Sequence, residues 1–285
     1  MSSASRGGIL KVASLAVALT FTAALAAGMA YAADPETPPG GATQDAPPSS
    51  AATTSPAALL GRVELRRQNT NRGDEEESTK TTLRIEAFLK GTVTRVRLDL
   101  QFPDEKTDFE GDPFQPQFGD TKVRVYFRPF QVGTTRLSSD VEMTFPTADP
   151  SSAGSGKYQL GAALHSVPGA PDFTLASGRH QVRYEWLVRQ TVSVAGDADR
   201  KDINTTKPEL ALRDTIDTRY WLKLTFKPVI DWIQDAKTGA VLDLEGGWNA
   251  NRFWRFSLIG GTRLWGEGVP GTYDSKIELV AGRAF

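Results

Sequence analysis

The chain of 285 residues contains no cysteine and only two histidines, His165 and His180. The absence of cysteine excludes disulfide bonds, thiolate metal sites and a cysteine nucleophile. Two histidines are too few for a histidine-rich metal centre. The chain also lacks an excess of charge, because its formal net charge is −1, and it therefore has no basic footprint for nucleic acid. We expect no metal, no cofactor and no nucleic-acid partner.

Long hydrophobic runs are also missing, apart from one near the N-terminus. The uncharged stretch Val12–Met29 follows Arg6 and Lys11, and Ala30-Tyr31-Ala32 then places small residues at the −3 and −1 positions of a cleavage site. This order predicts a secretory signal peptide over residues 1–32. The alternative is an N-terminal anchor helix, because about 18 apolar residues are just enough to span a bilayer.

The segment 33–58 has few charges and consists mainly of proline, alanine, serine, threonine and glycine. Such a composition cannot bury a hydrophobic core, so we predict a disordered spacer. A plug or a tether is the functional alternative. The remaining residues, 59–285, form the predicted folded domain.

A period of two dominates the sequence after Leu59. In the stretch 95–102 the side chains of Val, Leu, Leu and Phe alternate with those of Arg, Arg, Asp and Gln. Such alternation is typical of half-buried β-strands. It predicts twelve strands, near residues 61–67, 81–90, 94–103, 121–130, 138–146, 157–166, 179–194, 207–214, 219–228, 239–248, 252–265 and 275–285.

The predicted strands and their connections favour an all-β fold, a membrane-spanning antiparallel up-and-down β-barrel of about 12 strands. Most strands have about the ten residues that a tilted membrane strand needs. Short connections alternate with long ones, which is typical of outer-membrane barrels, although 167–178 is long where a short turn is expected. An even strand number places both termini in the periplasm. A periplasmic β-sandwich binding protein is the soluble alternative.

Aromatic residues gather near the predicted strand ends and suggest an interfacial girdle: Phe102, Phe127, Phe130, Phe145, Trp221, Trp248, Trp254 and Trp265. The core of a sandwich would use the same residue types. The chain ends with Phe285 on an alternating strand. A terminal aromatic residue of this kind resembles the signal that the outer-membrane assembly machinery recognises.

Two segments carry a family resemblance. Residues 145–161 contain Phe-Pro-Thr and Gly-Ser-Gly-Lys, and residues 193–204 contain Ala-Gly-Asp-Ala-Asp-Arg after an aromatic strand. In this order the motifs resemble the outer-membrane transporter-like family named for the MetA pathway of phenol degradation. The resemblance covers about residues 82–285. It implies an outer-membrane β-barrel with a role in the passage of small, often aromatic, compounds, and it implies no catalytic residues.

If the apolar side chains face lipid, the charged ones face the lumen. The candidate lumen and selectivity residues are Arg95, Arg97, Asp99, Lys122, Arg124, Arg128, Arg183, Glu185 and Lys223. Their modest basic excess predicts a water-filled pore with a slight preference for anions. The alternative is a salt-bridge network that fills a closed barrel, because twelve strands lie between the filled eight-stranded barrel and the open channel of about sixteen strands.

Catalysis is disfavoured, because His165 and Ser166 are neighbours on a strand and point to opposite faces. We predict an outer-membrane channel, not an enzyme, for the passive passage of small molecules. Its expected partners are outer-membrane lipid and lipopolysaccharide, the barrel assembly machinery and a small-molecule solute. A non-conducting structural or surface-interaction barrel is the alternative, and the sequence leaves the solute and the oligomeric state open.

Overall fold

The computed structural model describes residues 60–285, apart from 74–76, 105–116, 168–172 and 175–177. The chain divides into two units at this boundary, 1–59 and 60–285. The predicted signal peptide (1–32) and spacer (33–58) therefore lie outside the described residues. No helix within the described ranges is long and apolar enough to cross a membrane.

The described residues form one antiparallel β-sheet. Its strands are β1 (Gly61–Asn71), β2 (Glu77–Phe88), β3 (Val93–Pro103), β4 (Thr121–Phe127), β5 (Phe130–Val132), β6 (Thr135–Phe145), β7 (Lys157–Ser166), β8 (Phe173–Thr174), β9 (His180–Gly196), β10 (Asn204–Ile216), β11 (Tyr220–Asp231), β12 (Lys237–Asn249), β13 (Trp254–Trp265) and β14 (Ser275–Ala284). A short 3-10 helix at Ser151–Ala153 lies between β6 and β7.

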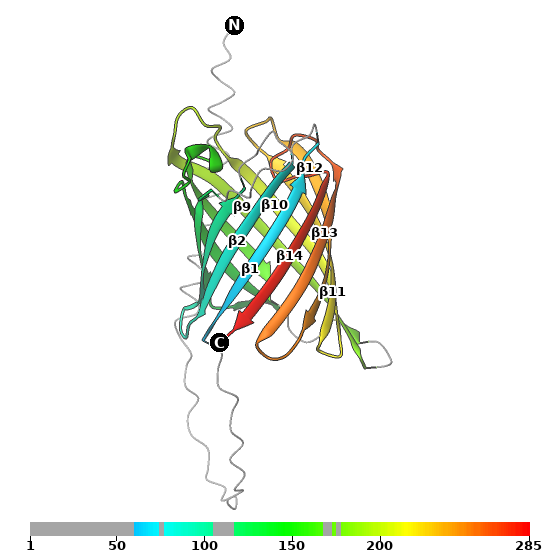
Figure 1. Cartoon of the computed structure of the whole chain (residues 1–285). Helices are drawn as coiled ribbons and strands as arrows, with labels where there is room; N and C mark the ends of the chain where they lie inside the picture. The colour runs from blue at the N-terminus through cyan, green and yellow to red at the C-terminus, as the bar shows by residue number, and fades with distance from the viewer. Residues whose placement is uncertain (1–59, 74–76, 105–116, 168–172, 175–177) are drawn as a thin grey trace, which may run out of the picture. The chain divides into compact units, whose positions relative to one another are not determined.

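Twelve of these strands close into a barrel, as the sequence predicts. Strand β1 pairs with β2 on one side and with β14 on the other, and β9 joins β10 (Figure 1). The short strands β5 and β8 each pair with a single strand, β6 and β9 respectively, and do not belong to the barrel wall. Closure pairs the backbone N–H and C=O groups that a free sheet edge would leave without partners. Strands that span a membrane require this pairing, because lipid offers no hydrogen bonds.

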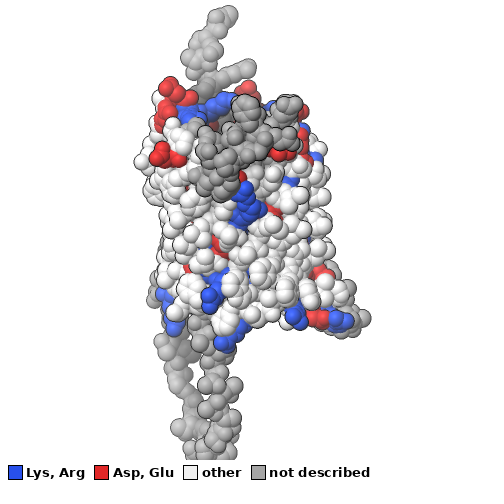
Figure 2. All heavy atoms as spheres, viewed as in Figure 1, with Lys and Arg blue, Asp and Glu red and all other residues white. Residues whose placement is uncertain are grey.

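The outer face of the barrel is apolar. Large hydrophobic side chains are exposed along it, including Leu65, Leu210, Leu224, Leu258 and Leu279. Figure 2 shows mostly uncharged atoms across the middle of the visible face and charged atoms near its two ends. Exposed leucines in a continuous band would be unfavourable in water, so this face is suited to lipid.

The two ends of the barrel differ in their connections. The end that holds both Leu60 and Phe285 has tight turns such as 217–219, and we call it the turn end; the opposite end is the loop end (Figure 1). In outer-membrane barrels the short turns are periplasmic and the longer loops extracellular. Asp217 and Thr218 both have positive φ angles, 49° and 58°, as a two-residue type I′ turn requires.

Several predicted boundaries differ from the structure. The predicted strand 121–130 ends at Phe127, because Pro129 has no N–H to donate, and β5 begins after it. The predicted long loop 229–238 is only 232–236, because β11 continues to Asp231 and β12 begins at Lys237. The exceptional connection 167–178 contains β8, which pairs with β9.

Candidate functional site: the barrel lumen

Inward-facing charges on β1, β2 and β3 form a network of ion pairs. Glu64 on β1 is 3% exposed and lies within 3.2 Å of Arg62, 3.6 Å of Arg66 and 3.5 Å of Arg84 (each a nitrogen–oxygen distance). The Arg84 Nε atom also donates to Asp99 Oδ1 at 2.9 Å. Each carboxylate is therefore shared between arginines on neighbouring strands.

The network continues across β3, β4, β6 and β9. Arg97 donates to Asp99 at 2.8 Å and lies 3.8 Å from Glu142, which also accepts from Arg124. Asp140 follows on β6, where it lies 3.7 Å from Arg124 and accepts from Arg189 on β9 at 2.8 Å. These contacts join four strands through side chains alone.

On the other side of β1 the network reaches β14, β12 and β11. Arg66 donates to Glu278 on β14 at 2.6 Å, and Lys276 lies 3.9 Å from the same carboxylate. Asp243 on β12 accepts from Lys276 at 2.7 Å and from Lys227 on β11 at 2.8 Å. We call this continuous network the ion-pair belt. It is the kind of internal salt-bridge network that the sequence leaves open as an alternative to a pore.

Most of the predicted lumen residues lie on inward faces, and most are paired. Arg97, Asp99 and Arg124 belong to the ion-pair belt, and Lys223 donates to Glu185 at 2.6 Å near the turn end. The Arg95 guanidinium stacks 3.6 Å from the centroid of the Tyr126 ring.

Three predicted residues differ from this pattern. Lys122 lies on the inward face of β4 without an ion pair within the described ranges. Arg183 is inward on β9, and its Nε atom is buried without a hydrogen-bond partner. Arg128 lies in the turn after β4 with an exposed side chain, so the structure does not place it on the inward face of a strand, because β4 ends one residue earlier.

Two cavities lie in the lumen on either side of the ion-pair belt. The cavity near the loop end has a volume of about 620 Å³, and its wall includes Lys80, Lys122, Gln101 and Gln159. The cavity near the turn end has a volume of about 460 Å³, and its wall includes Arg95, His165, Glu209 and Lys223. Both are lined by polar groups that can hydrogen-bond water or a solute.

The turn end of the lumen is narrowed by Trp221. Its side chain is 4% exposed and packs inward on β11, so the sequence-based placement of Trp221 in a lipid-facing girdle is wrong. The guanidinium carbons of Arg213 and Arg255 lie 5.5 Å and 5.0 Å from its ring centroid. Trp221 alternates with the outward Tyr220 and Leu222, and this alternation is the signal from which its inward direction could have been predicted.

Other aromatic residues do face outward. Trp254 and Phe256 stack with ring centroids 6.0 Å apart, and Trp248 lies 6.0 Å from Phe256. Arg283 on β14 lies 5.6 Å from the centroid of the Trp254 ring, near the turn end. An arginine at this outward position is thus accommodated by an aromatic face at the membrane boundary.

The loop 266–274 folds into the loop end of the lumen. Val269 and Tyr273 are buried, and the Tyr273 hydroxyl donates to Asp243 on the inward face of β12. Burial, together with this hydrogen bond, raises the pKa of Tyr273 above its usual range. The sequence predicts 266–274 only as a long loop, and strand alternation carries no signal for its inward direction.

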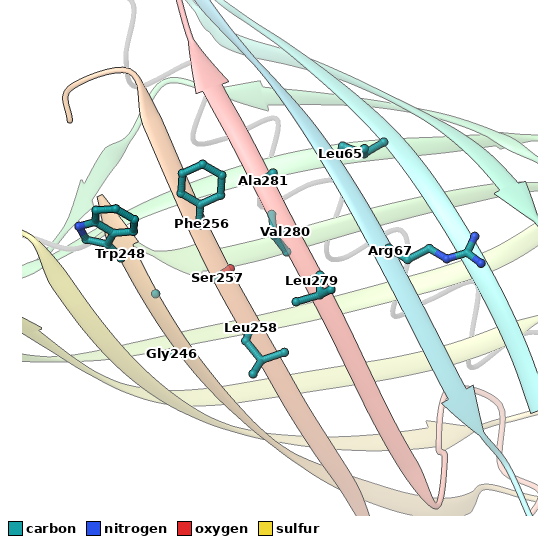
Figure 3. A pocket seen from close by; sticks show the side chains of 11 residues that line it. Leu65, Arg67, Gly246, Trp248, Phe256, Ser257, Leu258, Leu279, Val280 and Ala281 are labelled. Atoms are coloured by element: carbon teal, nitrogen blue, oxygen red, sulfur yellow. The ribbon is translucent and has the colours of Figure 1, made fainter. Parts of the chain in front are cut away.

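The outer surface carries a separate groove of about 560 Å³ (Figure 3). Leu65, Leu258 and Leu279 border it, and Gly246 on β12, the partner of Leu258, has open space where a side chain would be. Arg67 reaches its edge and forms an ion pair with Asp104. These side chains belong to the outward faces of β1, β12, β13 and β14, so the groove is part of the lipid-facing surface and not of the lumen.

The described residues offer little for metal binding or nucleophilic catalysis. Within these ranges no group of three or more His, Cys, Asp or Glu side chains is arranged to hold a metal ion. His165 faces the lumen, where its Nε2 atom lies 3.7 Å from Asp140, whereas the Ser166 hydroxyl donates to the Trp186 carbonyl of β9. The two side chains therefore form no nucleophile–base pair.

Comparison with known proteins supports the same architecture. No family model matches the chain, and no curated protein matches its sequence. The crystal structure of the COG4313 outer membrane channel from Pseudomonas putida F1 superposes with a TM-score of 0.60 at 12% identity, covering 84% of this chain and 100% of that chain. The KdgM porin (TM-score 0.48, 6% identity, 79% and 99% coverage) and the NanC porin (0.46, 10%, 79% and 98%) are more distant. The chain has the fold of an outer-membrane β-barrel.

Proposed function

We propose that this chain is an outer-membrane channel through which small solutes diffuse, with a preference for anions. The observation that carries the proposal is the pair of lumenal cavities, one on each side of the ion-pair belt, lined by polar side chains. A solute gradient supplies the driving force, and the barrel supplies a hydrated path with charged walls.

The anion preference follows from the cations that have no carboxylate partner. Within the described ranges these inward residues are Lys80, Lys122, Arg183, Lys207, Arg213 and Arg255. The inward carboxylates without an ion pair are Asp120, Glu209, Asp231 and Glu245. The belt compensates most of its own charge, with eight cations against six carboxylates. We expect the unpaired cations to contribute more to the selectivity than Arg97 and Arg124, because a carboxylate offsets the charge of each paired arginine.

The test is the reversal potential of the full chain in a planar bilayer under a KCl gradient. We expect a reversal potential displaced from zero toward the chloride equilibrium potential. The double variant Lys122→Gln/Arg183→Gln moves it toward zero, whereas Lys90→Gln, in an exposed turn, leaves it unchanged. A wild-type reversal potential of zero, or one displaced toward the potassium equilibrium potential, contradicts the proposed selectivity.

A second candidate is a non-conducting structural barrel. The ion-pair belt and the inward loop 266–274 favour it, since both fill the lumen with protein groups. In that case the folded barrel carries no current, and its function resides in the outer loops and in contacts with lipopolysaccharide. The resemblance to the MetA-pathway family supports the first proposal, a channel, with small aromatic compounds as its solutes. Neither proposal involves catalysis.

We also propose that Phe285 is read by the barrel assembly machinery. Phe285 is 54% exposed at the turn end, while its backbone N–H donates to the Gly61 carbonyl at 3.1 Å. Phe285→Ala is expected to lower the amount of barrel inserted in cells without changing refolding in detergent. Equal insertion of both proteins overturns this role.

A further inference from the structure

The cavity near the loop end has two lysines in its wall that form no ion pair with a described residue. Lys80 on β2 and Lys122 on β4 both line this cavity of about 620 Å³. Within the described ranges neither ammonium group makes an ion pair or a hydrogen bond to another side chain. This is unusual in a lumen where most neighbouring cations are paired.

The carboxylates near these lysines are already engaged. Asp99 lies opposite Lys122 on β3, but it accepts hydrogen bonds from Arg84 and Arg97. Asp104 is paired with Arg67. Arginines therefore engage both of these carboxylates, and neither of them pairs with Lys80 or Lys122.

Asp120 also lines this cavity, but its oxygens are directed elsewhere. Its Oδ2 atom accepts from the backbone N–H of Ser155 at 2.8 Å and from the Ser155 hydroxyl at 2.6 Å. Its Oδ1 atom is buried and does not open to the cavity. Asp120 thus holds the 146–156 loop and makes no ion pair with either lysine. It contributes one negative charge to a cavity wall that also carries Lys80, Lys122 and Arg72.

The lysines also repel one another. Lys80 and Lys122 line the same cavity, so their like charges oppose one another. Arg72 adds a further positive charge at the rim of the same cavity. Like charges held together at reduced hydration are unfavourable unless an anion joins them.

Neutral hydrogen-bonding groups complete the wall. Gln68, Gln101 and Gln159 line the cavity together with Ser78. Such amides and hydroxyls can donate to oxygen atoms that the lysines do not reach. Charge-assisted contacts from lysine, supported by neutral donors, are the usual chemistry of oxyanion recognition.

We propose that Lys80 and Lys122 form a binding site for a small oxyanion with two or more negative charges. This inference deepens the proposed channel function, on which it rests for the route by which the anion arrives. The site lies between the loop end and the ion-pair belt, so it concentrates multivalent anions before they reach the narrower part of the lumen.

The test uses pyrophosphate as the probe and the full chain in planar bilayers of phosphatidylcholine free of lipopolysaccharide. Pyrophosphate added on the loop side at constant ionic strength is expected to reduce the chloride current in a saturable way. In Lys80→Gln/Lys122→Gln the half-blocking concentration rises by about tenfold or more. Lys201→Gln removes the same charge from an exposed position in the loop 197–203 and is expected to match the wild type.

Calorimetric titration of the folded protein in detergent with pyrophosphate separates the two proposals. Saturable binding that depends on Lys80 and Lys122 in a barrel without current supports the site and overturns the channel. A current that pyrophosphate does not reduce, together with no heat of binding, overturns the site and leaves the channel intact. If the double variant does not fold, Lys80→Gln and Lys122→Gln alone are each expected to weaken binding, and unchanged binding in both overturns the site.

Discussion

The indole ring of Trp221 lies against the lumenal surface of Gly247, its partner across the β11–β12 pair. A Cβ atom at position 247 would lie 1.9 Å from Cζ2 of Trp221, so only glycine allows this approach. The ring therefore lies close to the barrel wall, with Arg213 and Arg255 near its faces. This arrangement places a buried indole on the lumenal side of the wall near the turn end.

The close approach at Gly247 predicts a loss of stability when a methyl group is added. Gly247→Ala forces the Trp221 ring away from the wall and is expected to lower the free energy of unfolding by about 1–3 kcal/mol. Gly246→Ala is the matched control, because its side chain would point outward into open space. Urea unfolding followed by tryptophan fluorescence measures both, and equal midpoints would show that the ring does not depend on Gly247.

Trp221 itself is predicted to restrict the current. Trp221→Ala removes the largest inward side chain near the turn end and is expected to raise single-channel conductance. Trp248→Ala, which removes an outward-facing indole on β12, is expected to leave conductance unchanged. A lower or equal conductance for Trp221→Ala would place the narrowest point elsewhere in the lumen.

Glu64 is predicted to be the most sensitive carboxylate of the ion-pair belt. Glu64→Gln leaves Arg62, Arg66 and Arg84 without their shared counter-charge. We expect the free energy of unfolding to fall by about 3 kcal/mol. This value is at the low end of the cost of removing one partner of a buried ion pair, because lumenal water screens the arginines. Glu77→Gln, at an exposed end of β2, serves as the control. A Glu64→Gln midpoint within error of the control would show that the belt contributes no stability there.

The raised pKa of Tyr273 predicts a dependence of stability on alkaline pH. The neutral phenol donates to Asp243, so its contribution is fully present below the ordinary tyrosine pKa of about 10. It is lost as the pH rises from there toward the higher pKa of the folded state. Tyr273→Phe lacks this contribution, and its unfolding midpoint is expected to fall less steeply above pH 10 than that of the wild type. Parallel curves over this range would contradict the contact.

The alternation of side chains made the barrel predictable from sequence. Val96, Leu98 and Leu100 alternate with Arg95, Arg97 and Asp99, and a shift of one residue would place three charges in lipid. The register of β3 is therefore fixed by its own residues. The strand number, the antiparallel order and most inward positions follow from the same rule.

Pairing and loop direction were not predictable in the same way. Whether Lys122 or Arg124 finds a carboxylate depends on the register of β4 against β3 and β6, which alternation within one strand does not determine. The inward fold of 266–274 depends on a contact between Tyr273 and Asp243, 30 residues apart. Alternation alone continues the predicted strand through Arg128, whereas Pro129 ends β4 at Phe127.

The most direct test of the account is the single-channel conductance of the folded full chain in a planar bilayer with symmetric KCl. Folding is verified beforehand by heat-modifiable mobility on a detergent gel. We predict discrete, reproducible current steps, because cavities on both sides of the ion-pair belt provide a hydrated path. A heat-modifiable barrel that carries no current would contradict the channel and would show that the lumenal charges close the barrel by pairing with one another.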